Sequence, residues 1–301
     1  RVLIVAGKGG VGKSTASATL ALAAARTGRS VLLVEVSGRS ATAPMFGAAA
    51  QGYEESVVYD DAAGGRVRSR SITPDGALIE WLARHGFSRV AKRMAKTGIL
   101  EIVATATPGI KDLLVLGRIK GLEVEDTADL IVVDAPAAGH AIQFLRAPLG
   151  VRETARAGVL HRQADETLEM LHDPSRCRAM LVSIPEETPV NELIETAFAV
   201  EDEVGLALGP VIVNSLLPEL RDLDRVPAGL SAEEETALRL AADLRRDRQR
   251  LQTEQLERLE AGLPLAQIRL PQLFTTTLGP PELHHLADAA TDSIERLGAW
   301  A

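Results

Sequence analysis

Near its start the chain reads Gly7-Lys8-Gly9-Gly10-Val11-Gly12-Lys13-Ser14, followed by Thr15. This stretch matches the pattern G-x-x-x-x-G-K-[ST]. It stands between an apolar run, Val2 to Ala6, and a run rich in alanine and leucine, Ser14 to Arg26. The order predicts a buried strand, a glycine-rich loop and a helix, which is the setting in which this pattern binds phosphate groups.

The residue types of this loop suit a nucleotide. Glycine lets successive backbone N–H groups turn inward to form an anion-binding nest, and the helix that begins near Ser14 adds the positive end of its dipole. We expect Lys13 to reach the β- and γ-phosphates and Ser14 to place its hydroxyl on Mg²⁺. All residues from Gly7 to Thr15 are therefore predicted to bind a nucleotide, with Mg²⁺ as a cofactor.

Length and composition indicate the class of protein. The 301 residues are 46% hydrophobic and 25% charged, which is typical of a globular chain with a large core. A net charge of −8 without a block of basic residues argues against nucleic acid as a partner. No uncharged apolar run approaches the roughly 20 residues that cross a bilayer, and no leader pattern stands at the start, so we expect a cytoplasmic protein.

The chain has one cysteine, Cys177. A single thiol excludes an intrachain disulfide, a C-x-x-C redox pair and a thiolate-rich zinc cage built from one chain, so no zinc is expected. We interpret Cys177 as a small buried hydrophobic residue rather than a reactive thiol.

Apolar runs recur along the chain and are separated by helix-like stretches rather than by hairpin turns. Runs of this kind are typical of buried parallel strands. We therefore predict an α/β fold, a doubly wound and mainly parallel sheet of seven or eight strands with helices on both faces. The apolar runs after the first are Val31 to Val36, Leu130 to Val133, Ala179 to Ile184 and Val211 to Val213; shorter candidate strands are Arg66 to Ile72 and Pro264 to Leu270.

Two regions depart from the alternation of strand and helix. The segment 75–122 has mostly helical patterning and is predicted to form a small helical subdomain inserted into a single domain, residues 1–301. Near the C-terminus, Ser231 and Glu234 fit a capping box, and acidic residues precede arginines in the stretch that follows. We expect a long amphipathic helix there, whose charged residues form a solvated surface.

Lys8 makes the loop more specific. Of the 33 Lys and Arg residues only six are lysines, and two of these, Lys8 and Lys13, fall inside the octapeptide. The form G-K-G-G-x-G-K-[ST] resembles the deviant phosphate loop of the family that includes partition, Min-type, arsenical pump-driving and guided-entry ATPases. The resemblance implies a P-loop NTPase fold and a nucleotide-bridged dimer, either a homodimer or a heterodimer with a paralogous ATPase. In that dimer Lys8 crosses the interface to the partner's nucleotide. Lys8 has no role within its own chain once Lys13 neutralises the phosphates, and an exposed structural lysine is the alternative.

A second motif follows the run that ends at residue 133. Asp134 closes this predicted strand and is expected to hold Mg²⁺ through water beside the phosphate loop. The passage Ala135-Pro136-Ala137-Ala138-Gly139-His140, with Gln143-Phe144-Leu145 after it, resembles the switch II of arsenical pump-driving and guided-entry ATPases. The resemblance implies that Gly139 lets this loop swing and that His140 lies near the γ-phosphate or at the dimer face. The alternative for His140 is a surface residue that caps a helix.

Further matches extend over most of the chain: Pro108-Gly109-Ile110, Ile184-Pro185-Glu186-Glu187 and Val211-Ile212-Val213-Asn214. In the family that these stretches resemble, the asparagine after the late strand recognises adenine, and a proline-containing loop after the last strand walls the base. The resemblance maps these roles onto Asn214 and onto Pro271, Gln272 and Leu273, and it implies ATP as the nucleotide. Without the resemblance, Asn214 is interpreted as a turn former.

One stretch departs from the family pattern. The family carries an aspartate in switch I that positions the attacking water, and in an alignment without gaps this aspartate falls on Pro44, while an earlier one falls on Ser37. Proline has no group that orients water, and Glu35 is the remaining carboxylate nearby. Loss of a group that aligns the nucleophile typically costs about two to four orders of magnitude in rate. We therefore expect this chain alone to hydrolyse ATP slowly or not at all.

Three hypotheses for function follow. The first is an ATP-binding dimeric switch ATPase with Lys8, Lys13, Asp134 and His140 as candidate catalytic residues, whose nucleotide state sets the exposure of segment 75–122 to a protein client or a membrane receptor. The second is a non-hydrolysing scaffold paired with an active paralogue, which turnover with and without that partner would separate from the first. The third is an ATP-dependent metabolic enzyme on the same fold; against it, no further acid–base cluster stands next to the loop.

Two specialised activities of the resembled family find no support in the sequence. Arsenical pumps bind their metalloid through several cysteines, and this chain has one. The four methionines are scattered, so a large methionine-rich groove for client helices is not expected.

Overall fold

The computed structural model describes residues 1–36, 40–62, 64–87 and 109–298. Its centre is an eight-stranded sheet in the order β3-β4-β2-β5-β1-β6-β7-β8, in which all neighbouring strands are parallel except β3 and β4. The prediction of a mainly parallel sheet with seven or eight strands is confirmed. The strands are β1 (Val2–Gly7), β2 (Ser30–Glu35), β3 (Ser56–Asp60), β4 (Arg66–Ser71), β5 (Leu130–Ala137), β6 (Cys177–Ser183), β7 (Val211–Leu216) and β8 (Gln267–Pro271).

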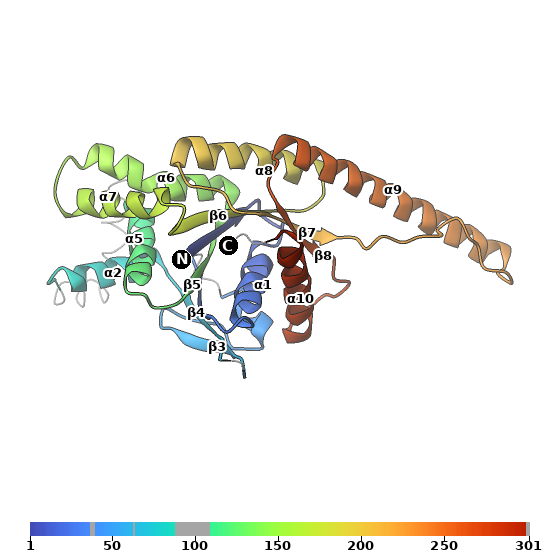
Figure 1. Cartoon of the computed structure of the whole chain (residues 1–301), viewed down its shortest axis with the longest axis horizontal. Helices are drawn as coiled ribbons and strands as arrows, with labels where there is room; N and C mark the ends of the chain where they lie inside the picture. Colours follow the sequence, from blue (N-terminus) through green and yellow to red (C-terminus); the bar gives the residue numbers. More distant parts are fainter. Residues whose placement is uncertain (37–39, 63, 88–108, 299–301) are drawn as a thin grey trace.

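Helices cover both faces of the sheet, as predicted (Figure 1). Ile4 and Val5 of β1 enter the cores on opposite faces, because side chains alternate along a strand. The face of Val5 carries α1 (Lys13–Ala25) and α10 (Pro280–Arg296). The face of Ile4 carries α2 (Pro74–Arg84), α5 (Ile110–Val124), α6 (Ala138–Thr154), α7 (Val159–His172), α8 (Glu187–Ala199) and the end of α9 (Ala232–Gly262).

Among the described strands, β3 is the one that the sequence pattern did not predict. It has five residues, lies at the edge of the sheet antiparallel to β4, and has no fully buried residue. Asp60 at its end forms an ion pair with Arg66 of β4. A short edge strand with one exposed face lacks the continuous apolar run that identified the buried parallel strands.

The helices α2 and α5 lie at the two ends of the segment expected as a helical subdomain. Leu78 of α2 and Leu116 and Ile119 of α5 belong to the core on one face of the main sheet. The two helices also pack on each other. Residues 88–108, the middle of the expected subdomain, lie outside the described residues.

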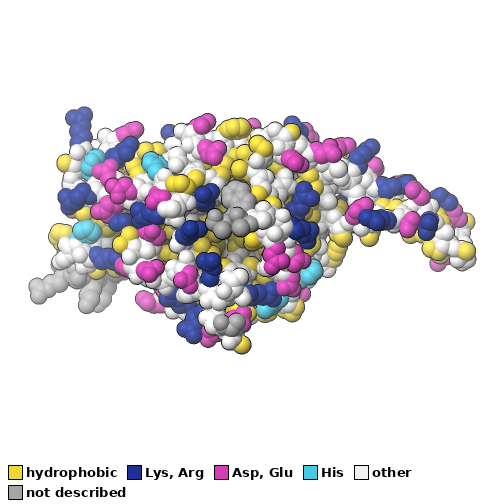
Figure 2. All heavy atoms as spheres, in the orientation of Figure 1, with side chains coloured by type: hydrophobic (Ala, Val, Ile, Leu, Met, Phe, Trp, Pro, Cys, Tyr) yellow, Lys and Arg dark blue, Asp and Glu magenta, His cyan; other side chains and the backbone are white. Residues whose placement is uncertain are grey.

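The long amphipathic helix predicted near the C-terminus is present. α9 has 31 residues and begins at a capping box, in which Ser231 and Glu234 each accept a hydrogen bond from the other's backbone N–H. Its last turns pack on α8, whereas its first part runs away from the body beside residues 217–231 (Figure 1). We call residues 217–254 the arm, and Figure 2 shows charged side chains of both signs along it. Neither α9 nor any other described helix combines the length and apolarity that would span a membrane.

Candidate nucleotide site

The phosphate loop joins β1 to α1 at the carboxyl edge of the sheet. Gly10 and Gly12 have positive φ angles of 89° and 90°, which residues with a side chain rarely adopt. Two positions are also sterically closed: a Cβ on Gly7 would lie 2.4 Å from the carbonyl oxygen of Val182, and one on Gly12 would lie 2.2 Å from the side-chain nitrogen of Asn214. The glycines therefore permit both the turn and the close approach of neighbouring strands.

Lys13 and Ser14 occupy the first turn of α1, with Thr15 next to them. The Nζ of Lys13 donates a hydrogen bond to the carbonyl oxygen of Lys8 at 3.0 Å, so the side chain lies back over the loop. Burial lowers the pKa of Lys13, and the carboxylate of Asp134 opposes that shift. A lysine held over a nest of backbone N–H groups is the arrangement that binds β- and γ-phosphates in loops of this pattern.

Asp134 of β5 contacts the first turn of α1. Its Oδ2 accepts a hydrogen bond from the hydroxyl of Ser14 at 2.6 Å, and its Oδ1 accepts one from Ser17 at 3.4 Å. The pKa of Asp134 is raised to about 6. Burial is the largest cause of this rise and the carboxylate of Glu35 adds to it, whereas the hydrogen bond from Ser14 acts in the opposite direction. The two residues expected to bind Mg²⁺ are thus in direct contact, and a cation beside them would offset the cost of burying this charge.

Glu35 is the neighbour of Asp134 across the sheet, since the two residues are in register between β2 and β5. Glu35 is fully buried, and its Oε1 accepts hydrogen bonds from the backbone N–H groups of Ala41 and Thr42 at 2.7 and 2.9 Å. Among the described residues its Oε2 has no hydrogen-bond partner. A buried carboxylate oxygen without a donor is costly, and next to Asp134 it is a suitable neighbour for a divalent cation.

Pro44 is the second residue of a short 3₁₀ helix, Ala43–Phe46, and is exposed. This helix directly follows Thr42. The backbone N–H of Thr42 donates a hydrogen bond to the carboxylate of Glu35, which fixes the start of the helix. Position 44 therefore supplies no group that could orient water. Ser37, the other departure in this stretch, lies outside the described residues.

Lys8 has a partner within its own chain. Its Nζ lies 2.5 Å from Oε1 of Glu192 on α8, and the two side chains are 40% and 39% exposed. The interpretation that Lys8 has no role in its own chain is therefore wrong, because the fold places α8 beside the loop although the two residues are 184 positions apart. Lys8, Gly9, Gly139 and Glu192 line a cavity of about 460 Å³ between the loop, the start of α6 and α8.

The switch II stretch passes from strand to helix without a loop between them. β5 ends at Ala137 and α6 begins at Ala138, so Gly139 and His140 lie in the first helical turn and are exposed. The backbone at Gly139 is helical in this structure, and the swing of this stretch stays a prediction. His140 lies close enough to Asp112 of α5 to lower its pKa, against burial, which raises it more strongly. This exposed position fits both the dimer-face and the helix-cap interpretation of His140.

Asn214 and the segment after β8 lie at the same edge of the sheet as the phosphate loop. The side-chain nitrogen of Asn214 donates a hydrogen bond to the carbonyl oxygen of Val11 at 3.0 Å, so this buried residue braces the loop. Pro271 is in register with Leu216, which follows Asn214 by two residues, and the N–H of Gln272 donates to the carbonyl oxygen of Leu216 at 2.8 Å. The fold thus brings Asn214 and the expected base wall, Pro271 to Leu273, to one place.

Two further residues of the site were not predicted. Ser17 follows Ser14 by three positions and shares its helix face, which is a signal that the sequence contained. Glu192, the partner of Lys8, carried no local signal, because only tertiary packing brings it to the loop. Cys177, by contrast, is buried as interpreted, and burial raises the pKa of its thiol to about 12.

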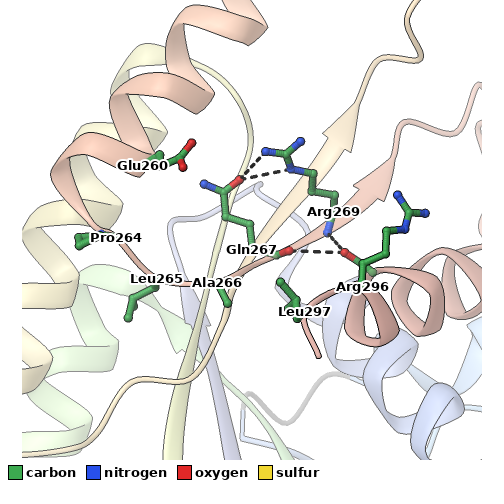
Figure 3. A pocket seen from close by; sticks show the side chains of 9 residues that line it. Glu260, Pro264, Leu265, Ala266, Gln267, Arg269, Arg296 and Leu297 are labelled. Atoms are coloured by element: carbon green, nitrogen blue, oxygen red, sulfur yellow. Dashed lines mark hydrogen bonds between the residues drawn. The ribbon is translucent and has the colours of Figure 1, made fainter. Parts of the chain in front are cut away.

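A second cavity lies away from the loop. It has a volume of about 480 Å³ and opens between the end of α9, the start of β8 and the end of α10 (Figure 3). In it, Arg269 donates hydrogen bonds to the side-chain oxygen of Gln267 at 3.4 and 3.2 Å. Gln267 begins β8 opposite the first residue of β7, so this cavity is at the amino edge of the parallel strands. It therefore takes no part in the phosphate site.

Comparison with known proteins identifies the family. The family described as anion-transporting ATPase matches residues 1–166, which include the phosphate loop and Asp134. The ATPase BagA of Mycobacterium tuberculosis is 35% identical over 241 residues, covering 76% of this chain and 70% of that protein. A Halobacterium salinarum protein named as an arsenical pump-driving ATPase is 28% identical over 239 residues (73% of this chain, 36% of that protein). The ATPase get3 of Neurospora crassa is 32% identical over 166 residues (53% of this chain, 46% of that protein). The loop, the sheet and these similarities together establish that the chain belongs to the anion-transporting ATPase family, on the P-loop NTPase fold that it shares with arsenical pump-driving and get3 ATPases.

Proposed function

We propose that this protein binds Mg²⁺-ATP at the phosphate loop and uses the bound nucleotide as a switch. The observation that carries the proposal is the convergence of Lys13, Ser14 and Asp134 at one edge of the sheet, with a 2.6 Å contact between Ser14 and Asp134. Lys13 would neutralise the β- and γ-phosphates, Ser14 would bind Mg²⁺ through its hydroxyl, and Asp134 would hold the ion through water. Mg²⁺ keeps most of its octahedral shell from water and phosphate oxygens, so two protein groups are sufficient.

The functional unit in this proposal is a dimer with the nucleotides at the interface, formed with a second copy or with a paralogue. Lys8 supports it, since this lysine stands at the open side of the loop and is held by an ion pair between two partly exposed groups. Such a pair is typically worth up to about 1 kcal/mol, so a triphosphate can displace Glu192. Sedimentation of wild type and Lys8→Ala with and without ATP tests this step. An ATP-insensitive monomer in both cases would refute it.

Hydrolysis by the chain alone is proposed to be slow. The support is the 3₁₀ helix at Pro44 together with the use of Glu35 to hold the backbone of Ala41 and Thr42, because neither position offers a mobile carboxylate to an attacking water. The same observation favours a second candidate function, a scaffold that binds ATP and depends on an active paralogue for turnover. Turnover of this chain alone and in mixture with such a paralogue separates the two functions.

The relatives suggest the purpose of the switch. Their names associate them with an arsenical pump and with get3, and this chain carries one cysteine, which favours a protein or membrane client over a metalloid. In this proposal the protein acts in the cytoplasm, and the nucleotide sets the dimer geometry and with it the exposure of segment 75–122.

Calorimetry with ATP in the presence and absence of Mg²⁺ tests the central claim. We expect saturable binding that weakens without Mg²⁺ and weakens in Ser14→Ala, because that variant loses a ligand of the ion. Equal binding by wild type and Ser14→Ala at every Mg²⁺ concentration would contradict the assignment of the metal site. Equal affinity for GTP would contradict adenine recognition and leave the phosphate site standing.

A further inference from the structure

The arm has two opposite faces, and one of them is covered by the chain itself. Gln252 of α9 accepts a hydrogen bond from the backbone N–H of Leu217 at 2.8 Å and donates one to its carbonyl oxygen at 3.2 Å. Arg245 donates a hydrogen bond to the carbonyl oxygen of Pro218 at 2.5 Å, and Ala242, one turn earlier on the same side of α9, is buried. Residues 217–231 therefore brace one side of α9 along the arm.

The face of α9 that points away from residues 217–231 carries three exposed leucines. We call Leu240, Leu244 and Leu251 the leucine stripe. Spacings of four and seven residues place the three side chains within about 40° of one another on a helix with 3.6 residues per turn. Their exposed fractions are 66%, 59% and 51%. Single exposed leucines are common, but three in line on a helix that projects from the body indicate a contact surface.

The arm leaves the body at the edge that carries the phosphate loop. β1, β6 and β7 are parallel, the loop follows the carboxyl end of β1, and the arm follows the carboxyl end of β7. The leucine stripe thus projects beyond the edge at which a second copy is proposed to dock.

The charges beside the stripe identify the partner. Along one flank of α9 stand Arg239, Asp243, Arg250 and Glu254, whose signs alternate as plus, minus, plus and minus. In the opposite direction along the helix the order of charges is minus, plus, minus and plus, so an antiparallel copy presents a charge of opposite sign at each position. In an antiparallel pair of α9 helices centred between positions 246 and 247, Arg239 meets Glu254 of the second copy and Asp243 meets its Arg250. In a parallel two-fold pair this flank of the two helices would lie on opposite sides of the interface, so the four charges would find no such partners.

These charges are available to a partner. All four form exposed ion pairs within α9: Arg239 lies 2.6 Å from Glu235, Arg250 lies 3.3 Å from Asp247 and 3.8 Å from Glu254, and Asp243 pairs with Arg246. Exposed pairs of this kind contribute about 0.3–0.5 kcal/mol and are readily exchanged. Between Leu240 and Leu251, Asp247 is the carboxylate in line with the leucines, and its charge opposes the pairing when Arg250 leaves it for Asp243 of the second copy.

We propose that the arms of two copies of this chain pair antiparallel through the leucine stripe. The pairing goes beyond the nucleotide switch and does not require it, since it uses neither the phosphate loop nor Lys8. It gives the protein a second contact between copies, one that persists when the nucleotide leaves.

Disulfide trapping tests the pairing and its direction. Because Cys177 is buried, a cysteine introduced on the arm is the accessible thiol. In an antiparallel pair, residues at the centre meet their own copies, whereas residues near the ends do not. We expect Asp247→Cys to form a covalent dimer under copper phenanthroline without nucleotide. Thr236→Cys, at an exposed position on the same side of the helix, is expected to remain monomeric. Failure of Asp247→Cys to cross-link, or equal cross-linking of Thr236→Cys, would overturn the antiparallel pairing.

Sedimentation without nucleotide measures the strength of the pairing. Leu244→Glu is expected to raise the dissociation constant on the order of tenfold to a hundredfold, since it places a charge where the pairing would bury a leucine. Asp247→Leu is expected to lower it, because it completes the stripe. Val124→Glu, which changes a residue of α5 that is 62% exposed, is the matched control and is expected to have no effect. Circular dichroism confirms that each variant keeps its helices. A wild-type monomer at all concentrations, or equal dissociation constants for wild type and Leu244→Glu, would refute the pairing while leaving ATP binding at Lys13 untouched.

Discussion

The phosphate loop and the segment after β2 leave the same edge of the sheet, and they differ in what their polar groups do. In the loop, glycines and the brace from Asn214 hold the backbone, which leaves the amine of Lys13 and the hydroxyl of Ser14 for a ligand. In the segment after β2, the carboxylate of Glu35 is itself the brace, and Pro44 supplies no polar group. In the proposed function, binding and hydrolysis of the nucleotide therefore depend on separate parts of this edge, and we expect substitutions to affect them independently.

Asp134 connects the two regions. β5 lies between β1 and β2 in the sheet, so its terminal carboxylate reaches Ser14 on one side and interacts with Glu35 on the other. Substitutions in the loop, at Asp134 and in the segment after β2 therefore test three properties separately: ATP affinity, the stability of the nucleotide-free protein and the rate of hydrolysis.

The largest effect is expected in the loop. Lys13→Ala should weaken ATP binding on the order of a hundredfold, because it removes the charge that opposes the β- and γ-phosphates. Calorimetry measures the affinity, with Lys120→Ala as the control, since Lys120 pairs with Glu166 on the surface. Wild-type affinity in Lys13→Ala would show that the loop is not the nucleotide site.

The next effect concerns the stability of the nucleotide-free protein. The pKa of Asp134 is raised from 3.8 to about 6, so the native state holds this proton more tightly than the unfolded chain. Its charge therefore destabilises the fold above pH 6, and the penalty disappears as the pH falls below about 4. Asp134→Asn should raise the free energy of unfolding by about 2–3 kcal/mol at pH 7.5 and by roughly half of that at pH 5.

Urea unfolding at the two pH values, without Mg²⁺ or nucleotide, measures this gain. Asp202→Asn, a change of an exposed carboxylate, is the control. A gain for Asp134→Asn that is absent, or that does not depend on pH, would show that Asp134 does not carry a raised pKa.

A smaller effect is expected in the segment after β2. Pro44→Asp should raise the single-turnover rate of ATP hydrolysis about tenfold and leave the affinity for ATP unchanged, because it adds a carboxylate where the water must be oriented. Glu35→Gln keeps an acceptor for Ala41 and Thr42 and should leave the rate as it is. If wild type hydrolysed ATP rapidly and Glu35→Gln abolished this activity, the expectation would be wrong, because the segment after β2 would then supply the catalytic carboxylate.

The smallest effect concerns the ion pair of Lys8. Glu192→Gln should promote ATP-dependent dimer formation by about twofold to fivefold, because it releases Lys8 from a partly exposed pair. Glu195→Gln, on the same helix and lining the same cavity, is the control. Weaker dimerisation of Glu192→Gln in sedimentation would indicate that the pair supports the interface instead of competing with it.

Local patterns were sufficient for the buried parts of the fold. The runs Val2 to Ala6 and Leu130 to Val133 are β1 and β5, because a strand covered on both faces must be apolar throughout. The edge strand β3 was not predicted, since its alternating burial resembles that of many loops. The turn at Gly10 and Gly12 was predictable as well, because few other residues adopt their backbone angles.

By itself, the sequence determined the phosphate loop, the strand–helix order, the capping box of α9 and the absence of a carboxylate at Pro44, because each of these depends on residues close together in the chain. Only the tertiary structure decided that Asn214 braces Val11, that Glu192 pairs with Lys8 and that Glu35 is used by the backbone of Ala41 and Thr42. The first two contacts join residues about 200 positions apart, and no local pattern records them. The third depends on the path of the chain after β2. The free energy of such contacts comes from burial and from hydrogen-bond partners that packing alone brings together.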